Sequence, residues 1–296
     1  MELLVQLLLN GLVDGSLYGL VAVGFALIFG ATRHFHIAHA GVFAAAGYGS
    51  AVLAQRMGFP TVLAVIVAIA FAVLIGVALA RVVYVPLGRR GGQGFVLFLV
   101  SLGAMTIIEN LFTLWVGAQP QQVDLGGWFT HAVKVGKWSL TAGQIVIVLL
   151  GLAMFVALLL TLRHTKAGKL IKAYSGNPEF IQIVGHRASR VLMLVYAVGS
   201  LFAAVAGVYV GGDTGMQPGL GETYFIISIM AVFIGGIGSI SGAFVSAMVL
   251  GVLQNVLLQW IDSQWTLPVI FTVFLILITA SPNGLAGLRM QKRRVA

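Results

Sequence analysis

The sequence has 296 residues, of which 59% are hydrophobic and only 8% are charged, and its formal net charge is +9. Soluble domains carry about 25% charged residues, so this composition excludes a water-soluble globular protein and predicts an integral membrane protein. The mean hydropathy of +1.03 agrees with that prediction. No cysteine is present, which excludes disulfides and thiolate metal sites.

The basic residues gather at the ends of apolar segments. They are Arg89 and Arg90, then Arg163, Lys166, Lys169 and Lys172, then Arg187 and Arg190, and finally Arg289, Lys292, Arg293 and Arg294. A nucleic-acid-binding surface would instead interleave basic and aromatic residues on one polar face. The positive-inside rule explains the observed distribution as cytoplasmic loops, so we expect no nucleic acid partner.

Six uninterrupted apolar segments match the length of about 20 residues that a helix needs to span a membrane. They are residues 7–30, 61–84, 95–117, 142–163, 190–211 and 266–281. Two further segments, 37–55 and 223–259, are apolar but interrupted, and such breaks are tolerated only where the backbone is buried in protein or lines a cavity. We predict an all-α polytopic membrane protein with one domain over residues 1–296 and about 8 to 10 transmembrane segments, broken or re-entrant helices included.

Two loops are predicted to lie on opposite sides of the membrane. Residues 163–190 carry six Lys or Arg and the tail from 289 carries four, which predicts that both are cytoplasmic. The loop 118–140 is then external, and its Gly126-Gly127 pair between aromatic and alternating polar residues suggests a small β-hairpin. The side of the N-terminus stays open.

The stretch "ATRHFHIAHAGVF" (31–43) holds three of the six histidines. His34, His36 and His39 are spaced two and three apart, which points them in different directions on a helix, and no acidic residue or cysteine lies nearby. The stretch is therefore a poor match for a metal site. The chain also lacks a nucleophile-elbow serine motif, so an intramembrane enzyme finds little support.

The position of each histidine in the stretch favours a different role. We expect His34 and its neighbour Arg33 to lie at the membrane interface, where they cap the first helix and touch lipid headgroups. His39 lies between two alanines at the start of an apolar half-helix. A polar side chain there is costly unless it faces a cavity or another helix, so His39 favours a solute pathway.

The second broken segment contains "FIGGIGSISGAF" (233–244), in which glycines and serines interrupt an apolar pattern. The helix before it, "GETYFIISIMAVFIGG" (221–236), resembles "GSLYGLVAVGFALIFG" (15–30), which precedes the histidine stretch. Transporters are often built from inverted repeats whose broken helices meet near the midplane. A chance likeness of two glycine-rich helices is the alternative.

The loop 163–190 also contains a short amphipathic pattern. After Asn177 and Pro178 the sequence predicts a helix over 179–184 that ends at Gly185. If its apolar residues Phe180, Ile181 and Ile183 are exposed to the cytoplasm, they need a groove on a partner protein. A solvated basic loop is the alternative. The chain has no Walker A motif, so a transporter of this sequence would need an external ATPase or another source of energy.

Five motifs in order resemble the LivH-type permease subunits of ABC importers for branched-chain amino acids and related small solutes. They are "GSLYGLVAVGFALIFG", "FHIAHAGVFAAAGY", "GKLIKAYSGNPEFIQIVGHRASRV", "SLFAAVAGVYVG" followed by "AVFIGGIGSISGAFVSAMVLGVLQN", and "SPNGLAGLR". The second is similar to the family's "NFAHG" segment and the third to its ATPase-coupling loop. The resemblance runs nearly from end to end.

The resemblance implies a set of partners and site residues. The partners are a homologous second permease (LivM-like), two cytoplasmic ATPase subunits (LivG/LivF-like), a periplasmic substrate-binding protein and membrane lipid. ATP and Mg²⁺ would be bound by the ATPase subunits, with no cofactor and no metal in this chain. The implied solute pathway comprises Tyr18, His36, His39, Gly41, Gly235, Gly236, Gly238 and Ser239. The implied coupling residues are Asn177, Pro178, Glu179, Gly185 and Arg187.

Two departures from the family pattern bear on the solute. His36 stands where the family usually has Asn, and Ala40 stands where it has Gly. An amide is thereby replaced by a titratable imidazole. Branched-chain amino acids are the expected solutes, and urea, short amides and carboxylates, aromatic acids among them, are alternatives. A self-sufficient channel or secondary carrier is the alternative to the importer.

Overall fold

The computed structural model describes residues 2–92, 94–183, 185–281 and 284, and it is almost entirely helical, as predicted. The helices are α1 (Glu2–Thr32), α2 (Ala38–Ala51), α3 (Thr61–Ala78), α4 (Val85–Arg89), α5 (Gly94–Val116), α6 (Gly127–Thr130), α7 (Ala142–His164), α8 (Lys166–Gly176), α9 (Pro178–Ile183), α10 (Ala188–Asp213), α11 (Leu220–Gly235), α12 (Ile240–Leu257) and α13 (Ser263–Ala280). Two π-helical turns, η1 (Val52–Arg56) and η2 (Leu79–Tyr84), extend α2 and α3. The basic tail from 289 lies outside the described residues.

Within the described residues, seven helical segments are long and apolar enough to cross a membrane. Six of them correspond to the six uninterrupted segments of the sequence, and the seventh is α12. The two interrupted segments are also helical: 37–55 forms α2 with η1, and 223–259 forms α11 and α12 with a break at 236–239. The prediction of an all-α polytopic membrane protein with broken helices is confirmed.

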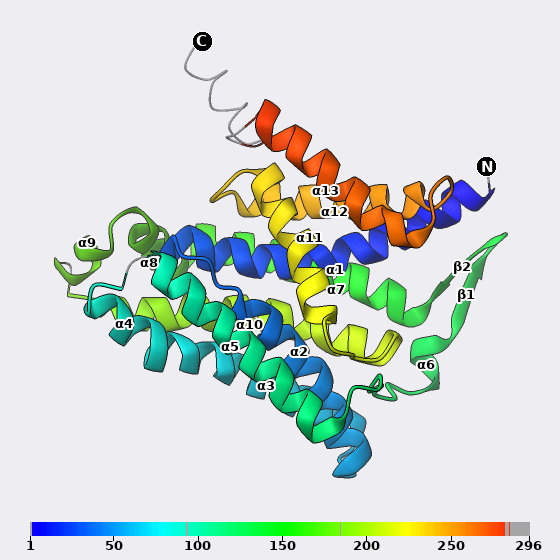
Figure 1. Ribbon diagram of the computed structural model, residues 1–296, viewed down its shortest axis with the longest axis horizontal. Helices are drawn as coiled ribbons and strands as arrows, with labels where there is room; N and C mark the ends of the chain where they lie inside the picture. Colours follow the sequence, from blue (N-terminus) through cyan, green and yellow to red (C-terminus); the bar gives the residue numbers. More distant parts are fainter. Residues whose placement is uncertain (1, 93, 184, 282–283, 285–296) are drawn as a thin grey trace. The chain divides into compact units, whose positions relative to one another are not determined.

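The helices, whose order along the chain can be followed in Figure 1, group into two compact units. Among the described residues, unit one comprises those within 2–26, 126–153 and 226–284, and unit two those within 27–125 and 154–225. The helices α1, α7 and α11 each run from one unit into the other.

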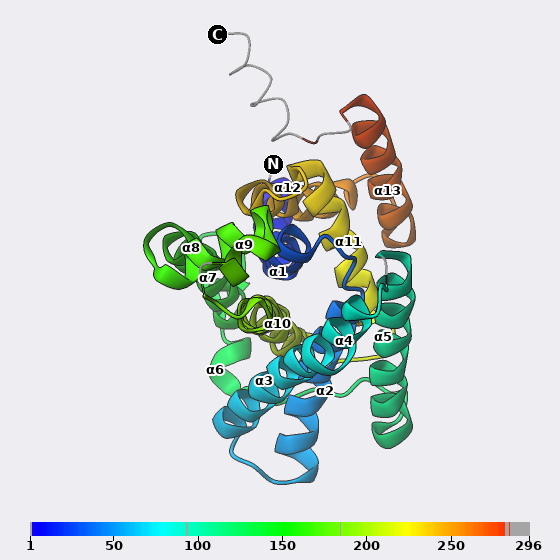
Figure 2. The ribbon, with the colours of Figure 1, turned by 90° about the vertical axis from the view of Figure 1, so that its left-hand side faces the viewer.

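Unit two is built around α2, every residue of which is buried. Figure 2 shows α2 beside α3, α5 and α10, with which it makes its main contacts. The helix is rich in alanine and glycine, so the neighbouring backbones approach closely: a Cβ atom on Gly47 would lie 2.8 Å from the Gly207 carbonyl oxygen. Small residues allow such packing in membranes, where the hydrophobic effect does not drive helices together.

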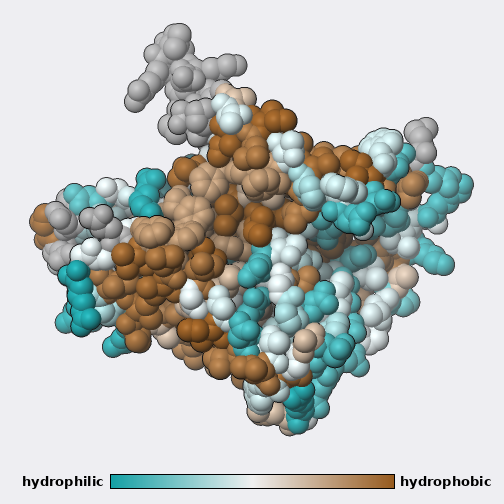
Figure 3. Space-filling model, viewed as in Figure 1, coloured by the Kyte–Doolittle hydropathy of each residue, from teal (hydrophilic) through white to brown (hydrophobic). Residues whose placement is uncertain are grey.

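The helix α3 also packs through small residues. Its buried residues are Ala64, Ala68, Ala72 and Gly76, one per turn on a single face. Its large residues point outward instead, and Ile66 and Leu74 are 58% and 65% exposed. Figure 3 shows hydrophobic residues gathered on the surface over α5, which likewise faces outward. Outward apolar side chains and inward small ones are the pattern of helices in lipid.

Unit one contains a close crossing of α1 and α12. Gly11, Gly15 and Gly19 recur every four residues on α1, and a Cβ atom on Gly15 would lie 2.8 Å from the Met248 Cα atom. The Asn255 side chain on α12 donates a hydrogen bond of 2.7 Å to the Asp14 carboxylate beside this crossing. Asp14 therefore has a polar partner inside an apolar span.

The β-hairpin predicted within 118–140 forms slightly later in the chain. Strand β1 (Ala132–Val135) pairs antiparallel with β2 (Trp138–Thr141) through a turn at Gly136-Lys137. The pair Gly126-Gly127, where the turn was expected, instead starts the short helix α6, and Gly126 has a φ of 92°. At Gly126 the positive φ therefore occurs at the start of a helix. Gly136, with a φ of 65°, forms the hairpin turn instead.

Candidate functional site

The helix break between α1 and α2 turns the chain into the interior of unit two. The helix α1 ends at Thr32, and Arg33 takes the left-handed conformation with a φ of 59°. Arg33 is exposed, but His34 is only 6% exposed and its Nε2 atom lies 2.6 Å from the hydroxyl of Tyr196. The expectation that His34 touches lipid headgroups is therefore wrong. The Tyr196 hydroxyl on α10 gives this imidazole a polar partner inside the protein.

His36 starts a chain of hydrogen bonds that ends on the backbone of α2. Its Nδ1 atom lies 3.0 Å from the Tyr84 hydroxyl, which donates to the Ser101 Oγ atom at 3.1 Å. The same Oγ atom accepts the Ala38 N–H at 2.9 Å. The N-cap residue of α2, Ile37, has no side chain that could accept this N–H. Ser101 on α5 therefore caps α2 from a neighbouring helix.

These hydrogen bonds imply the tautomer of His36. Because the Tyr84 hydroxyl donates to Ser101, it accepts from the Nδ1–H group of His36. The Nε2 atom is then an acceptor, and it is fully buried without a hydrogen-bond partner among the described residues. A buried acceptor without a partner is costly, so this atom is suited to a water molecule or to a polar group of a solute.

Tyr84, Ser101 and Tyr196 belong to this cluster, and sequence reasoning missed all three. Each lies in an apolar span, where a hydroxyl group is the exception, but 63 residues separate Ala38 from Ser101 and 162 separate His34 from Tyr196. A tyrosine within a predicted span was the available signal, since a buried tyrosine hydroxyl needs a partner.

His39 and Gly41 lie on the first turn of α2. The His39 ring is fully buried, with its centroid 5.8 Å from the His36 ring and 6.1 Å from the Phe225 ring. Gly41 faces α5, where an added Cβ atom would lie 3.2 Å from the Ile108 side chain. Among the described residues, no three His, Cys, Asp or Glu side chains are placed to hold a metal ion.

The second break, at 236–239, lies in unit one. Gly236 and Gly238 have φ values of 99° and 86°, which favour glycine, and Ser239 caps α12 by accepting the Gly242 N–H at 3.0 Å. Gly235 lies so close to the Gly242 backbone that no side chain fits between them. The break thus joins two helices tightly.

The remaining predicted pathway residue, Tyr18, lies on α1 in unit one. Its hydroxyl donates to the Gln254 side chain on α12 at 2.8 Å, and its carbonyl oxygen accepts from the Ser228 hydroxyl at 3.1 Å. It is 4% exposed. Tyr18 thus contributes to the packing of α1 on α12 in unit one, whereas His36, His39 and Gly41 belong to unit two.

The predicted coupling helix is present as α9, which Pro178 begins. Ile183 is 81% exposed, as expected, but Ile181 is fully buried, so the expectation that it is exposed is wrong. The helix α9 packs against α10 and against the amphipathic helix α8, which was not expected from the sequence. The side chains of Glu179 and Phe180 lie outside the described part of the structure.

The residues around α9 have backbone roles. Asn177 ends α8 in an extended conformation, Gly185 has a φ of 79°, and Arg187 is the N-cap residue of α10. An exposed apolar side chain on a short helix between two turns is suited to a groove on another protein.

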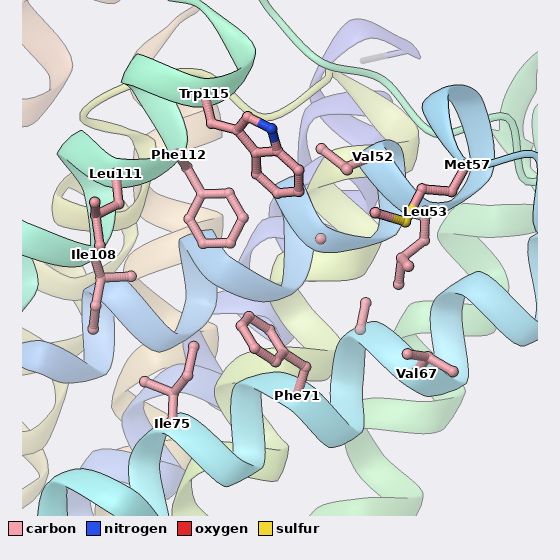
Figure 4. Close-up of a pocket in the computed structure, with 12 residues that line it drawn as sticks. Val52, Leu53, Met57, Val67, Phe71, Ile75, Ile108, Leu111, Phe112 and Trp115 are labelled. Carbon is pink, nitrogen blue, oxygen red and sulfur yellow. The ribbon is translucent and has the colours of Figure 1, made fainter.

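A cavity of about 370 Å³ lies between α2 with η1, α3 and α5 (Figure 4). Its side chains are apolar, and Phe71, Phe112 and Trp115 point into it. The rings offer no hydrogen-bond acceptor or charge for a polar solute. The polar cluster at the α1–α2 break is therefore the better candidate for contact with a small polar molecule.

Comparison with known proteins identifies the family. Residues 7–279 match the model of the family described as "Branched-chain amino acid transport system / permease component". The chain belongs to this family. It is a permease subunit of an ABC importer and a multi-pass protein of the inner membrane, and it is not itself an enzyme.

Individual relatives support this family assignment. The permease protein LivH of the high-affinity branched-chain amino acid transport system of Salmonella typhimurium is 26% identical over 298 residues, which cover 95% of each chain. BraD of Pseudomonas aeruginosa, of a transport system with the same description, is 26% identical over 294 residues, again 95% of each chain. Among solved structures, a chain of PsaBC from Streptococcus pneumoniae in complex with a Fab has the same fold, with a TM-score of 0.54, 12% identity, and coverage of 91% of this chain and 90% of that one.

Proposed function

We propose that this permease moves branched-chain amino acids, together with a homologous LivM-like permease, two LivG/LivF-like ATPase subunits and a periplasmic binding protein. The observation that carries the proposal is the buried polar cluster at the α1–α2 break, in a chain of the branched-chain amino acid permease family. LivH and BraD, whose names state that solute class, support the choice.

The mechanism is alternating access without chemistry on the solute. The partner ATPases bind ATP and Mg²⁺, and their closure moves α9, whose exposed Ile183 lies in a groove of an ATPase subunit. The glycines at 236 and 238 allow the backbone changes at the break, and the small residues of α2 let its neighbours slide at close distance. The solute passes polar groups at the breaks, among them the Nε2 atom of His36.

Selectivity is tested by competition. The complete transporter is reconstituted with its binding protein, and uptake of labelled leucine is measured with an excess of isoleucine, valine, urea, acetamide or benzoate. We expect isoleucine and valine to compete and the other three compounds to leave uptake unchanged. Loss of uptake with urea, acetamide or benzoate alone would assign the system to that solute class instead.

The partners are tested by mild extraction of the tagged chain from native membranes. We expect a second multi-span permease and two Walker A ATPases to co-purify. Isolation of the chain alone, or only with copies of itself, would contradict the proposed assembly.

A further inference from the structure

A strongly basic pocket lies in unit two where one span ends and another begins. Its volume is about 430 Å³, and four arginines line it: Arg81 on η2, Arg89 on α4, Arg187 before α10 and Arg190 in the first turn of α10. We call these four residues and the space between them the arginine pocket. Val85 and Met193 form part of its apolar wall.

The arginine pocket has no counter-charge of its own. No acidic residue lines it, and within the described part of the chain none of the four guanidinium groups makes a hydrogen bond or an ion pair. Four like charges that face one space repel one another. An anion in the pocket would relieve this repulsion and fill the donor sites of the guanidinium groups.

The N-terminus of α10 adds to the positive potential of the pocket. The helix has 26 residues, and its N-cap residue, Arg187, makes no side-chain capping hydrogen bond. Ser189, in the first helical turn, also lines the pocket. The positive end of the helix dipole there favours a phosphate-sized anion.

The position of the pocket indicates where the anion comes from. The pocket lies between the C-terminal end of the span Thr61–Arg89 and the N-terminal end of the span Ala188–Asp213. Val85, Pro86 and Met193 line the pocket together with the arginines, so apolar surface adjoins the charges. In Figure 3 hydrophilic residues gather near α4, next to the hydrophobic surface over α5. Basic pockets between transmembrane helices bind lipid headgroups, with the acyl chains along the apolar surface.

We propose that the arginine pocket binds the phosphate group of an anionic phospholipid. Arginine pairs with phosphate through two parallel hydrogen bonds, and the apolar wall accommodates the start of the acyl chains. Free phosphate would use the charges but not the apolar wall. This site is independent of the transported solute.

The test uses the intact, delipidated transporter complex and native mass spectrometry. The complex is titrated with phosphatidylglycerol and with phosphatidylcholine of the same acyl chains. We expect the parent to bind phosphatidylglycerol at least about tenfold more tightly than phosphatidylcholine. The double variant Arg81→Gln/Arg190→Gln should lose about tenfold in affinity for phosphatidylglycerol. Arg187 is left unchanged because of its proposed part in coupling.

The matched control is Arg163→Gln/Lys169→Gln, which removes two exposed positive charges from the same basic loop region but outside the pocket. It should keep the affinity for phosphatidylglycerol. Equal affinity of the parent for the two lipids would overturn the proposal even if the double variant did not fold. An equal loss in the control, or displacement of the lipid by excess inorganic phosphate, would also overturn it. Loss of the ATPase subunits with unchanged lipid affinity would show that the pocket docks a protein instead.

Discussion

At the scale of single residues, the break between α1 and α2 depends on side chains that other helices supply. Ser101 accepts the first N–H of α2, and Tyr84 connects Ser101 to His36. The sequence predicted that a polar residue in this break would face the protein interior, and His36 and His39 do so. It could not predict the partners, because those hydroxyl groups come from distant spans and depend on how the helices pack.

The cap on α2 is tested by Ser101→Ala. The variant leaves the Ala38 N–H and the Tyr84 hydroxyl without their acceptor, so we expect a loss of about 1–2 kcal/mol in the free energy of unfolding. Thermal unfolding of the purified protein in detergent measures it. The control is Ser246→Ala, because the buried Ser246 hydroxyl has no hydrogen-bond partner among the described residues. Equal losses in both variants would contradict the capping role.

The role of His36 is tested by two substitutions. In His36→Asn the amide can donate to Tyr84 as the imidazole does, so we expect uptake within a few-fold of the parent. In His36→Leu the donor is lost and the Tyr84 hydroxyl stays buried without it, so uptake should fall by about tenfold or more. ATPase activity of the assembled complex should remain in both. Equal uptake by the Asn and Leu variants would exclude a polar role for this position.

At the level of helices, small residues explain how closely neighbouring helices pack. The apolar spans could be read from hydropathy, since each is a long run of apolar residues. The short helix α8 was missed because its basic residues looked like a solvated loop, although Thr165 caps it by accepting the Gly168 N–H at 3.0 Å. Sequence periodicity alone did not show that Ile181 would be buried there.

The glycine crossing of α1 and α12 is tested by Gly15→Leu. A side chain at this position meets the Met248 backbone, so the two helices would have to separate. We expect a large loss of folded, monodisperse protein, measured by size-exclusion chromatography. The control is Gly103→Leu on α5, where an added Cβ atom meets nothing within 4 Å. A similar loss from Gly103→Leu would show that added bulk itself, not the crossing, lowers the yield.

The coupling helix is tested by comparing its two isoleucines. Ile183→Glu changes an exposed side chain, so it should lower ATPase-driven uptake and co-purification of the ATPases without lowering the unfolding temperature. Ile181→Ala removes a buried side chain and should cost about 2–4 kcal/mol of stability. If Ile183→Glu left uptake and co-purification intact, α9 would not be the docking element.

For the molecule as a whole, the sequence predicts a polytopic membrane protein, the order of its spans and the positions of the breaks, because each follows from composition along the chain. The two compact units could not be predicted from composition, because three helices each contribute residues to both units. The predicted pathway residues divide along the same line, with Tyr18 and the glycines of the second break in unit one and His36, His39 and Gly41 in unit two. The likeness of segments 15–30 and 221–236 remains a prediction of an internal repeat.

We propose that this chain forms a solute pathway that works only with ATP hydrolysis in its partners. The most direct measurement reconstitutes the complete transporter in liposomes and follows labelled leucine with its binding protein, with and without ATP and Mg²⁺ on the side of the ATPase subunits. We expect accumulation against the concentration gradient only when ATP, Mg²⁺ and the binding protein are all present. Equilibration of leucine without ATP would contradict it and indicate a channel or a secondary carrier.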